Sequence, residues 1–249
     1  YRDAFNQYYQ GESQVLYASK AWNCLAVCAI AASEGLGIDV VSGGELYTAL
    51  NAGVSPDKIY LHGNNKSQSE LILAIESGVT IVVDNWQELH TLVQLSTFNS
   101  ARAERPATAN STRIMLRLTP GIECHTHEYI RTGHLDSKFG FDPNDLDEVF
   151  SFVSKQSCLN CVGLHAHIGS QIFELQPHRD LASVMVQWFR DTAKYGLNLT
   201  ELNIGGGLGV QYTESDDPPS IEDWVKVICE VLQETCATQN LPLPKLLCE

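Results

Sequence analysis

Basic residues are scarce in this chain of 249 residues, which has 16 lysines and arginines against 30 aspartates and glutamates. The formal charge of −14 opposes contact with nucleic-acid phosphates and with anionic membrane surfaces. Long apolar runs are also missing, since the longest, residues 24–32, is too short to cross a bilayer. The first residues show no signal-peptide pattern. We therefore expect no nucleic-acid or membrane partner and a cytoplasmic location, with an organellar location as the alternative.

A dense framework of paired cysteines is missing as well, although the chain has eight cysteines. Cys24 and Cys28 fall on an apolar helical pattern and are expected in the core. Cys158 and Cys161 form a lone CxxC, without the second pair or the histidines that a structural zinc site needs. We therefore predict free thiols in a reducing compartment.

What the chain does contain is a strict alternation of apolar runs and amphipathic helical stretches. Eight strands are predicted, at residues 15–19, 37–42, 58–63, 80–85, 112–119, 162–169, 201–207 and 243–249. A helix is predicted in each of the seven intervals between them. Apolar strands separated by helices indicate a parallel sheet covered on both faces. Eight such units favour an α/β fold of the TIM type, a (β/α)8 barrel. An open, doubly wound sheet is the alternative.

The ends and two connections of this barrel carry further expectations. The chain lacks an initiator Met and stops in a strand, so we interpret residues 1–249 as one barrel domain, incomplete at its C-terminus, from a longer protein. The polar stretch 97–111 is predicted to be a surface loop. The long connection 120–142 is predicted to be a functional loop after a strand.

Reactive residues follow several of the predicted strands, where the active site of a barrel lies. Lys20 follows the first strand, and partial desolvation by Tyr17 and Trp22 would make it a nucleophile toward aldehydes; a solvated surface lysine is the alternative. After the seventh strand, backbone amides of a glycine run can approach a phosphate closely, or the run is only a tight turn. The run is Gly205, Gly206 and Gly207, and Val210 stands where a dinucleotide fingerprint needs a third glycine.

Histidines offer a competing chemistry. His165 and His167 are two apart in a predicted strand, so we expect them on one face, as metal ligands or, more commonly, as core histidines. His125, His127 and His134 in the long connection are a weaker metal candidate, and we predict no metal. Pyridoxal phosphate would suit this combination at one barrel mouth: a lysine, a glycine run with Ser170 nearby, a ring that can stack and an acid.

Eight short motifs occur in the order and approximate spacing of the diaminopimelate decarboxylases. They are YASK (17–20), DVVSGGE (39–45), HGNNK (62–66), RLTPG (117–121), TG with SKFG (132–133, 137–140), GLHAHIGSQ (163–171), NIGGGLG (203–209) and CE (248–249). The chain resembles these pyridoxal-phosphate enzymes, which join an alanine-racemase-like barrel to a β-domain and act as homodimers. The resemblance implies an amino-acid substrate and a β-domain that is absent from residues 1–249.

The resemblance also assigns roles to single residues. Lys20 matches the lysine that carries the cofactor as a Schiff base, and His167 matches the ring that stacks on it. Ser170 and glycines 205–207 match the phosphate contacts. Glu249 matches the acid that pairs with the pyridine nitrogen, and Asp39 and Arg117 match supporting polar residues.

The implied activity is decarboxylation of meso-2,6-diaminopimelate to L-lysine and carbon dioxide, the last step of lysine biosynthesis. A decarboxylase of ornithine or arginine, a racemase, and a non-catalytic cofactor-binding homologue are alternatives on the same scaffold. A metal-dependent hydrolase that uses His165 and His167 is a further alternative. Because the family's substrate-binding arginines and proton-donating cysteine follow the matched region, we expect residues 1–249 alone to be poorly active and poorly folded.

Overall fold

The computed structural model describes residues 1–102, 111–122 and 138–249, without the side chains of residues 99–102. Eight parallel strands close into a barrel in chain order, and β1 pairs with β8 through Ser13 and Leu246. The strands are β1 (Ser13–Ala18), β2 (Gly37–Val40), β3 (Ile59–Leu61), β4 (Thr80–Val83), β5 (Thr112–Arg117), β6 (Leu159–His165), β7 (Glu201–Asn203) and β8 (Lys245–Cys248). The predicted (β/α)8 barrel is confirmed, and the open sheet is excluded.

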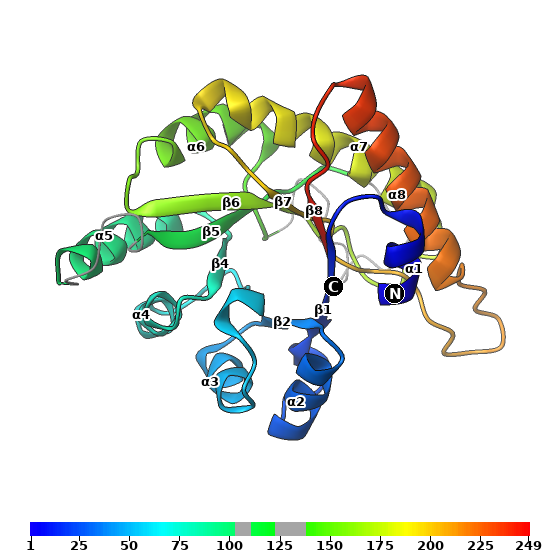
Figure 1. The fold of residues 1–249 in the computed structure, drawn as a ribbon, viewed down its shortest axis with the longest axis horizontal. Helices are drawn as coiled ribbons and strands as arrows, with labels where there is room; N and C mark the ends of the chain where they lie inside the picture. Colours follow the sequence, from blue (N-terminus) through cyan, green and yellow to red (C-terminus); the bar gives the residue numbers. More distant parts are fainter. Residues whose placement is uncertain (103–110, 123–137) are drawn as a thin grey trace.

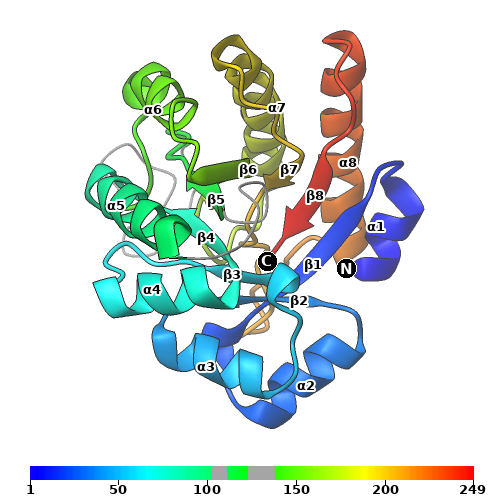
Figure 2. The same cartoon turned by 60° about the vertical axis from the view of Figure 1, so that its left-hand side comes forward.

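A ring of helices surrounds the strands (Figures 1 and 2). One helix lies in each interval between strands: α2 (Leu25–Ser33), α3 (Gly43–Asn51), α4 (Gln68–Ser77), α5 (Trp86–Arg102), α6 (Leu146–Val153), α7 (Gln176–Asp191) and α8 (Ile221–Thr238). An additional helix, α1 (Arg2–Tyr8), precedes β1 and packs against α8. There the rings of Tyr1 and Phe5 meet the buried ring of Trp224 edge-on, at centroid distances of 5.7 and 6.4 Å. Helix α1 thus covers the barrel beside α8 and β1.

Local sequence signals explain where the helices begin and end. A capping box begins α4, because Ser67 accepts from the Glu70 amide while the Glu70 side chain accepts from the Ser67 amide. The same helix ends at Gly78, whose φ of 74° is the left-handed conformation that glycine adopts at little cost. On α7, Leu181, Met185 and other apolar residues of one face are buried, as their spacing predicts.

Several predicted boundaries are wrong. Helix α5 continues through Arg102, so residues 97–102 are helical rather than loop; no Gly or Pro interrupts them, and the Thr97 hydroxyl bonds the Val93 carbonyl oxygen at 2.7 Å. The rest of that stretch lies outside the described residues. Strand β6 ends at His165, so the prediction that His165 and His167 share one strand face is also wrong. His167 lies beyond the paired part of the strand.

Disulfides and membrane-spanning helices, neither of which the sequence predicts, can be assessed for the described residues. The seven cysteines among them are free thiols, and Cys28, Cys161, Cys229, Cys236 and Cys248 are buried. Within the described ranges, no helix has both the length and the apolar character needed to span a membrane.

Candidate active site at the C-terminal mouth of the barrel

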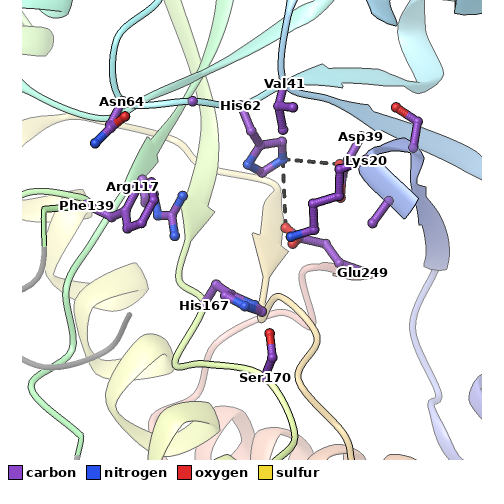
Figure 3. A pocket seen from close by; sticks show the side chains of 13 residues that line it. Lys20, Asp39, Val41, His62, Asn64, Arg117, Phe139, His167, Ser170 and Glu249 are labelled. Atoms are coloured by element: carbon purple, nitrogen blue, oxygen red, sulfur yellow. Dashed lines mark hydrogen bonds and ion pairs between the residues drawn. The ribbon is translucent and has the colours of Figure 1, made fainter. Parts of the chain in front are cut away.

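A cavity of about 430 Å³ opens where the strands end (Figure 3). This volume suits a small-molecule ligand. The cavity brings together six of the predicted site residues: Lys20, Asp39, Arg117, His167, Ser170 and Glu249. It also adds His62, Asn64 and Phe139, to which the sequence assigned no role. The loop histidines 125, 127 and 134 lie outside the described residues.

Lys20 is presented by a short 3-10 turn, Ser19–Ala21, directly after β1. The predicted desolvation by aromatic rings does not occur: Lys20 is exposed and Trp22 is 68 % exposed, while the Tyr17 hydroxyl donates to the Trp22 carbonyl oxygen at 3.1 Å. The turn is fixed from beneath by Glu45, whose Oε2 accepts from the buried Ser19 hydroxyl at 3.1 Å and from the Val41 amide at 2.7 Å. The Lys20 ammonium is therefore held at the mouth without being enclosed.

Asp39, on β2, is a buried carboxylate on the cavity wall. Its Oδ1 lies 3.1 Å from Nε2 of His62, and its Oδ2 is buried without a hydrogen-bond partner among the described residues. Burial raises the pKa of Asp39 well above its usual range, and the nearby charge of Glu249 adds to this effect, while Lys20 opposes it. An unsatisfied buried carboxylate oxygen at a cavity is a polar group available to a ligand.

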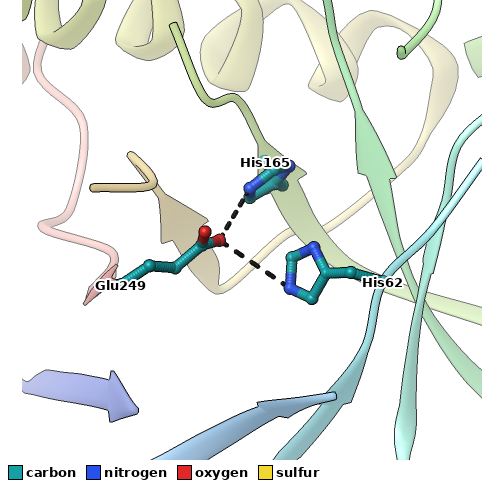
Figure 4. Close-up of side chains that lie close together, drawn as sticks. All are labelled: His62, His165 and Glu249. Carbon is teal, nitrogen blue, oxygen red and sulfur yellow. Dashed lines mark hydrogen bonds and ion pairs between the residues drawn. The ribbon is translucent and has the colours of Figure 1, made fainter. Parts of the chain in front are cut away.

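Glu249 follows β8, and its carboxylate receives polar contacts from His165, His62 and Asn203 on one oxygen. Figure 4 shows the two histidines. Oε1 of Glu249 lies 2.8 Å from His165 Nε2, 3.3 Å from Asn203 Nδ2 and 3.7 Å from His62 Nε2. Burial by itself would raise the pKa of Glu249, yet the neighbouring imidazoles and the hydrogen bond from His165 hold it well below its usual range. Glu249 is thus an anion at the floor of the cavity.

The three histidines around Glu249 are neutral because they are buried. Burial lowers the pKa of His62 and of His165 to about 4, and the pKa of His167 to about 3. His62, His165 and Glu249 place three potential metal-ligating atoms within 4.8 Å of one another. The hydrogen bond of His165 and the charge contact of His62 with Glu249 account for this arrangement. The pair considered as a metal alternative, His165 and His167, is not the pair that meets here.

The glycine run packs against the backbone beneath the cavity. Gly205 and Gly207 have φ of 66° and 107°. A Cβ on Gly206 would lie 2.6 Å from the carbonyl oxygen of Glu249, so only glycine fits. The Gly206 amide lies 3.3 Å from Nδ1 of His167, which orients that ring toward the cavity. The run is thus more than a turn, since it lets three chain segments approach one another closely.

A second group of charges supports the mouth beside β3, β4 and β5. The Lys66 ammonium lies 2.9 Å from a Glu88 carboxylate oxygen, with side chains 1 % and 4 % exposed. Nearby, Nε of Arg117 lies 3.7 Å from Asp84 Oδ1, and its guanidinium covers the Phe139 ring at 4.2 Å. This arrangement fixes the side chain of Arg117 at the cavity wall.

Comparison with known proteins identifies the family. Residues 2–249 match the family described as the pyridoxal binding domain of pyridoxal-dependent decarboxylases. The chain belongs to this family. The diaminopimelate decarboxylase of Synechocystis sp. is 60 % identical over 257 residues, which cover 100 % of this chain and 53 % of that protein. That of Bacillus subtilis is 40 % identical, covering 94 % of this chain and 52 % of the relative.

Solved structures agree with this assignment. The crystal structure of diaminopimelate decarboxylase from Helicobacter pylori, complexed with L-lysine, superposes with a TM-score of 0.86 at 29 % identity, over 100 % of this chain and 58 % of that one. The chain spans about half the length of the curated relatives it matches. Membership of a pyridoxal-dependent family identifies pyridoxal phosphate as the cofactor.

The residues of this pyridoxal-binding domain fit that cofactor. An exposed ammonium, Lys20, stands at a cavity of suitable size, and Asp39 Oδ2 is an unsatisfied polar atom on its wall. At the floor, the anion of Glu249 suits a protonated ring nitrogen. A side chain on any glycine of the run would clash with neighbouring backbone, as expected of a backbone cradle for phosphate.

Sequence reasoning missed the residues that hold these groups in place. His62 and Asn203 contact the two acids, and Glu45 supports the turn of Lys20. His62 and Glu45 stand in motifs already singled out, HGNNK and DVVSGGE, so their positions after strands three and two were the available signal. Lys66 also stands in HGNNK, whereas its partner Glu88 lies in none of the motifs.

Proposed function

We propose that residues 1–249 form the cofactor-binding domain of a diaminopimelate decarboxylase, which converts meso-2,6-diaminopimelate to L-lysine and carbon dioxide. The observation that carries this proposal is 60 % identity with the Synechocystis enzyme across the whole chain. A solved relative of the same name is complexed with L-lysine, the product expected here. The protein that contains this domain is proposed to be a cytoplasmic homodimer.

Each cavity residue has a proposed part in this reaction. Lys20 would bind the cofactor's aldehyde, and Ser170 with the glycines 205–207 would hold its phosphate. His167 would stack on its ring and Glu249 would keep a proton on its ring nitrogen, with Asp39 and Arg117 supporting the site. Pyridoxal phosphate, when bound, supplies an electron sink for the loss of a carboxylate. Because Glu249 is an anion before any ligand arrives, the protein has the charge in place that this chemistry needs.

Borohydride reduction followed by peptide mapping tests the cofactor site. In the full-length protein loaded with pyridoxal phosphate, we expect a pyridoxyl group on Lys20. Lys20→Ala should abolish the label, whereas Lys194→Ala, at a side chain 65 % exposed, should retain it. Absence of the label from Lys20 in the folded protein would contradict the assignment of this residue.

Substrate profiling tests the reaction itself. We expect carbon dioxide and L-lysine from meso-diaminopimelate, and little release from ornithine or arginine. Release from one of the latter substrates alone would replace the proposal with another decarboxylase. A pyridoxyl label on Lys20 without release from any of the three would indicate a racemase or a cofactor-binding homologue.

A further inference from the structure

The contacts on Glu249 are one-sided. His165 from β6, Asn203 from β7 and His62 from the loop after β3 all approach Oε1, at 2.8, 3.3 and 3.7 Å. In Figure 4 both imidazoles point to the same oxygen of the carboxylate. A carboxylate that accepts two or three N–H bonds strongly favours its ionised form. Among the described residues these contacts fall on Oε1, and Glu249 lines the cavity, so Oε2 is the oxygen available to a ligand.

The surroundings of His165 determine which nitrogen carries its proton. The residue is fully buried, and its Nδ1 has no hydrogen-bond partner among the described residues. A proton on Nδ1 would leave a buried donor unsatisfied and would direct the lone pair of Nε2 at the carboxylate. The neutral form protonated on Nε2 avoids both costs. His165 therefore donates, and Glu249 accepts.

The same geometry separates His165 from the other buried histidines. His62 is shared between two carboxylates, since its Nε2 is 3.1 Å from Asp39 and 3.7 Å from Glu249. His167 accepts from the Gly206 amide at 3.3 Å. His165 alone among these three makes its short contact, 2.8 Å, to Glu249.

We propose that His165 is a positioning residue which donates its Nε2 proton to Oε1 of Glu249, holds that carboxylate as an anion and leaves Oε2 to face the ring nitrogen of the cofactor. This inference rests on the proposed function. In the absence of the donor, a buried acid and a buried pyridine can share one proton as a neutral pair. The hydrogen bond from His165 opposes this transfer, because it stabilises the carboxylate and not the carboxylic acid.

15N NMR shows directly which atom carries the proton, with the full-length protein loaded with pyridoxal phosphate labelled at the ring nitrogen. In the wild type the ring nitrogen should have the shift of a protonated pyridine. His165→Leu should change the ratio of ring-protonated to carboxyl-protonated forms about tenfold to a hundredfold toward the acid, the value of one hydrogen bond to a charged group. The ring signal then moves toward the neutral position. His165→Gln retains an N–H donor and should restore the wild-type shift.

His178→Leu is the matched control, since it also removes a fully buried histidine but one on α7 that makes no hydrogen bond to Glu249. An unchanged ring-nitrogen shift in His165→Leu, or an equal change in His178→Leu, would overturn the proposal. The borohydride label on wild-type Lys20 keeps the two hypotheses apart, because its absence would refute the cofactor site rather than the role of His165.

A second measurement does not depend on the folding of any variant. In wild-type protein with 15N-labelled histidine, the signals of His165 should show a proton on Nε2 and none on Nδ1. The opposite tautomer would refute the donor role even if His165→Leu failed to fold.

Discussion

Removing the ammonium of Lys66 should destabilise the barrel more than any exposed charge does. Its Nζ donates to the carbonyl oxygens of Gly63 and Val82, at 2.6 and 2.7 Å, and to both oxygens of Glu88, at 2.9 and 3.1 Å. Burial lowers the pKa of Lys66 while Glu88 opposes that shift, so the two charges depend on each other. Lys66→Met keeps the length of the side chain but leaves the Glu88 carboxylate without its counter-ion. Such a loss costs about 3–5 kcal/mol.

Equilibrium unfolding in urea, followed by circular dichroism on the gene-encoded protein, measures this cost. Lys194→Met is the control: its partner Asp191 is as close, 3.1 Å, but the Lys194 side chain is 65 % exposed, so the expected cost is about 0–1 kcal/mol. Combining Lys66→Met with Glu88→Gln removes both buried charges and should recover about half of the loss or more. A cost for Lys66→Met no larger than that of the control would refute the reasoning.

Three smaller predictions concern pH, the glycine run and a helix end. Burial lowers the pKa of His178 to about 4, so between pH 6.5 and 4 only the unfolded chain takes up this proton, and the free energy of unfolding falls as pH falls. In His178→Leu, the free energy of unfolding measured in urea should depend on pH less steeply in that window, by about 1.4 kcal/mol per pH unit. Gly206→Ala places a Cβ against the Glu249 carbonyl oxygen and should cost about 1–3 kcal/mol in the same assay, with weaker binding of pyridoxal phosphate by fluorescence titration. Ser67→Ala removes the capping box and should cost about 1 kcal/mol, without changing cofactor binding.

The architecture was predictable because each of its signals is local. Apolar strands such as residues 80–83 and the capping box of Ser67 and Glu70 can be recognised within a few consecutive residues. Eight repetitions of the same unit then leave little choice of fold. Strand ends were less accurate, since β6 ends at His165, where its pairing with Arg117 and Asn203 ends, and pairing depends on neighbours far along the chain.

The residues that line the site could be predicted as well as the architecture, but the contacts and charge states of these residues could not. Lys20 was placed at the cavity by its position after a strand, and Asp39 and Glu249 were placed there by the resemblance. The expected enclosure of Lys20 by aromatic rings failed, because the conformation of one turn decides whether Trp22 folds over it or faces solvent. The partners of the acids depend on which strand ends face one another across the barrel, and no spacing in the sequence encodes that.

The closed barrel gives each acid at its mouth a partner from another strand end. Glu249 after β8 meets His165 from β6, and Asp39 on β2 meets His62 from the loop after β3. The 3.7 Å contact between His62 and Glu249 joins the loop after β3 to the end of β8, which are brought together when the barrel closes. Glu249, held as an anion by its contacts, needs no rearrangement when a cofactor enters, which is the condition under which fixed charges are most effective in catalysis. Closure of the barrel and preparation of the site for its cofactor are therefore one folding event.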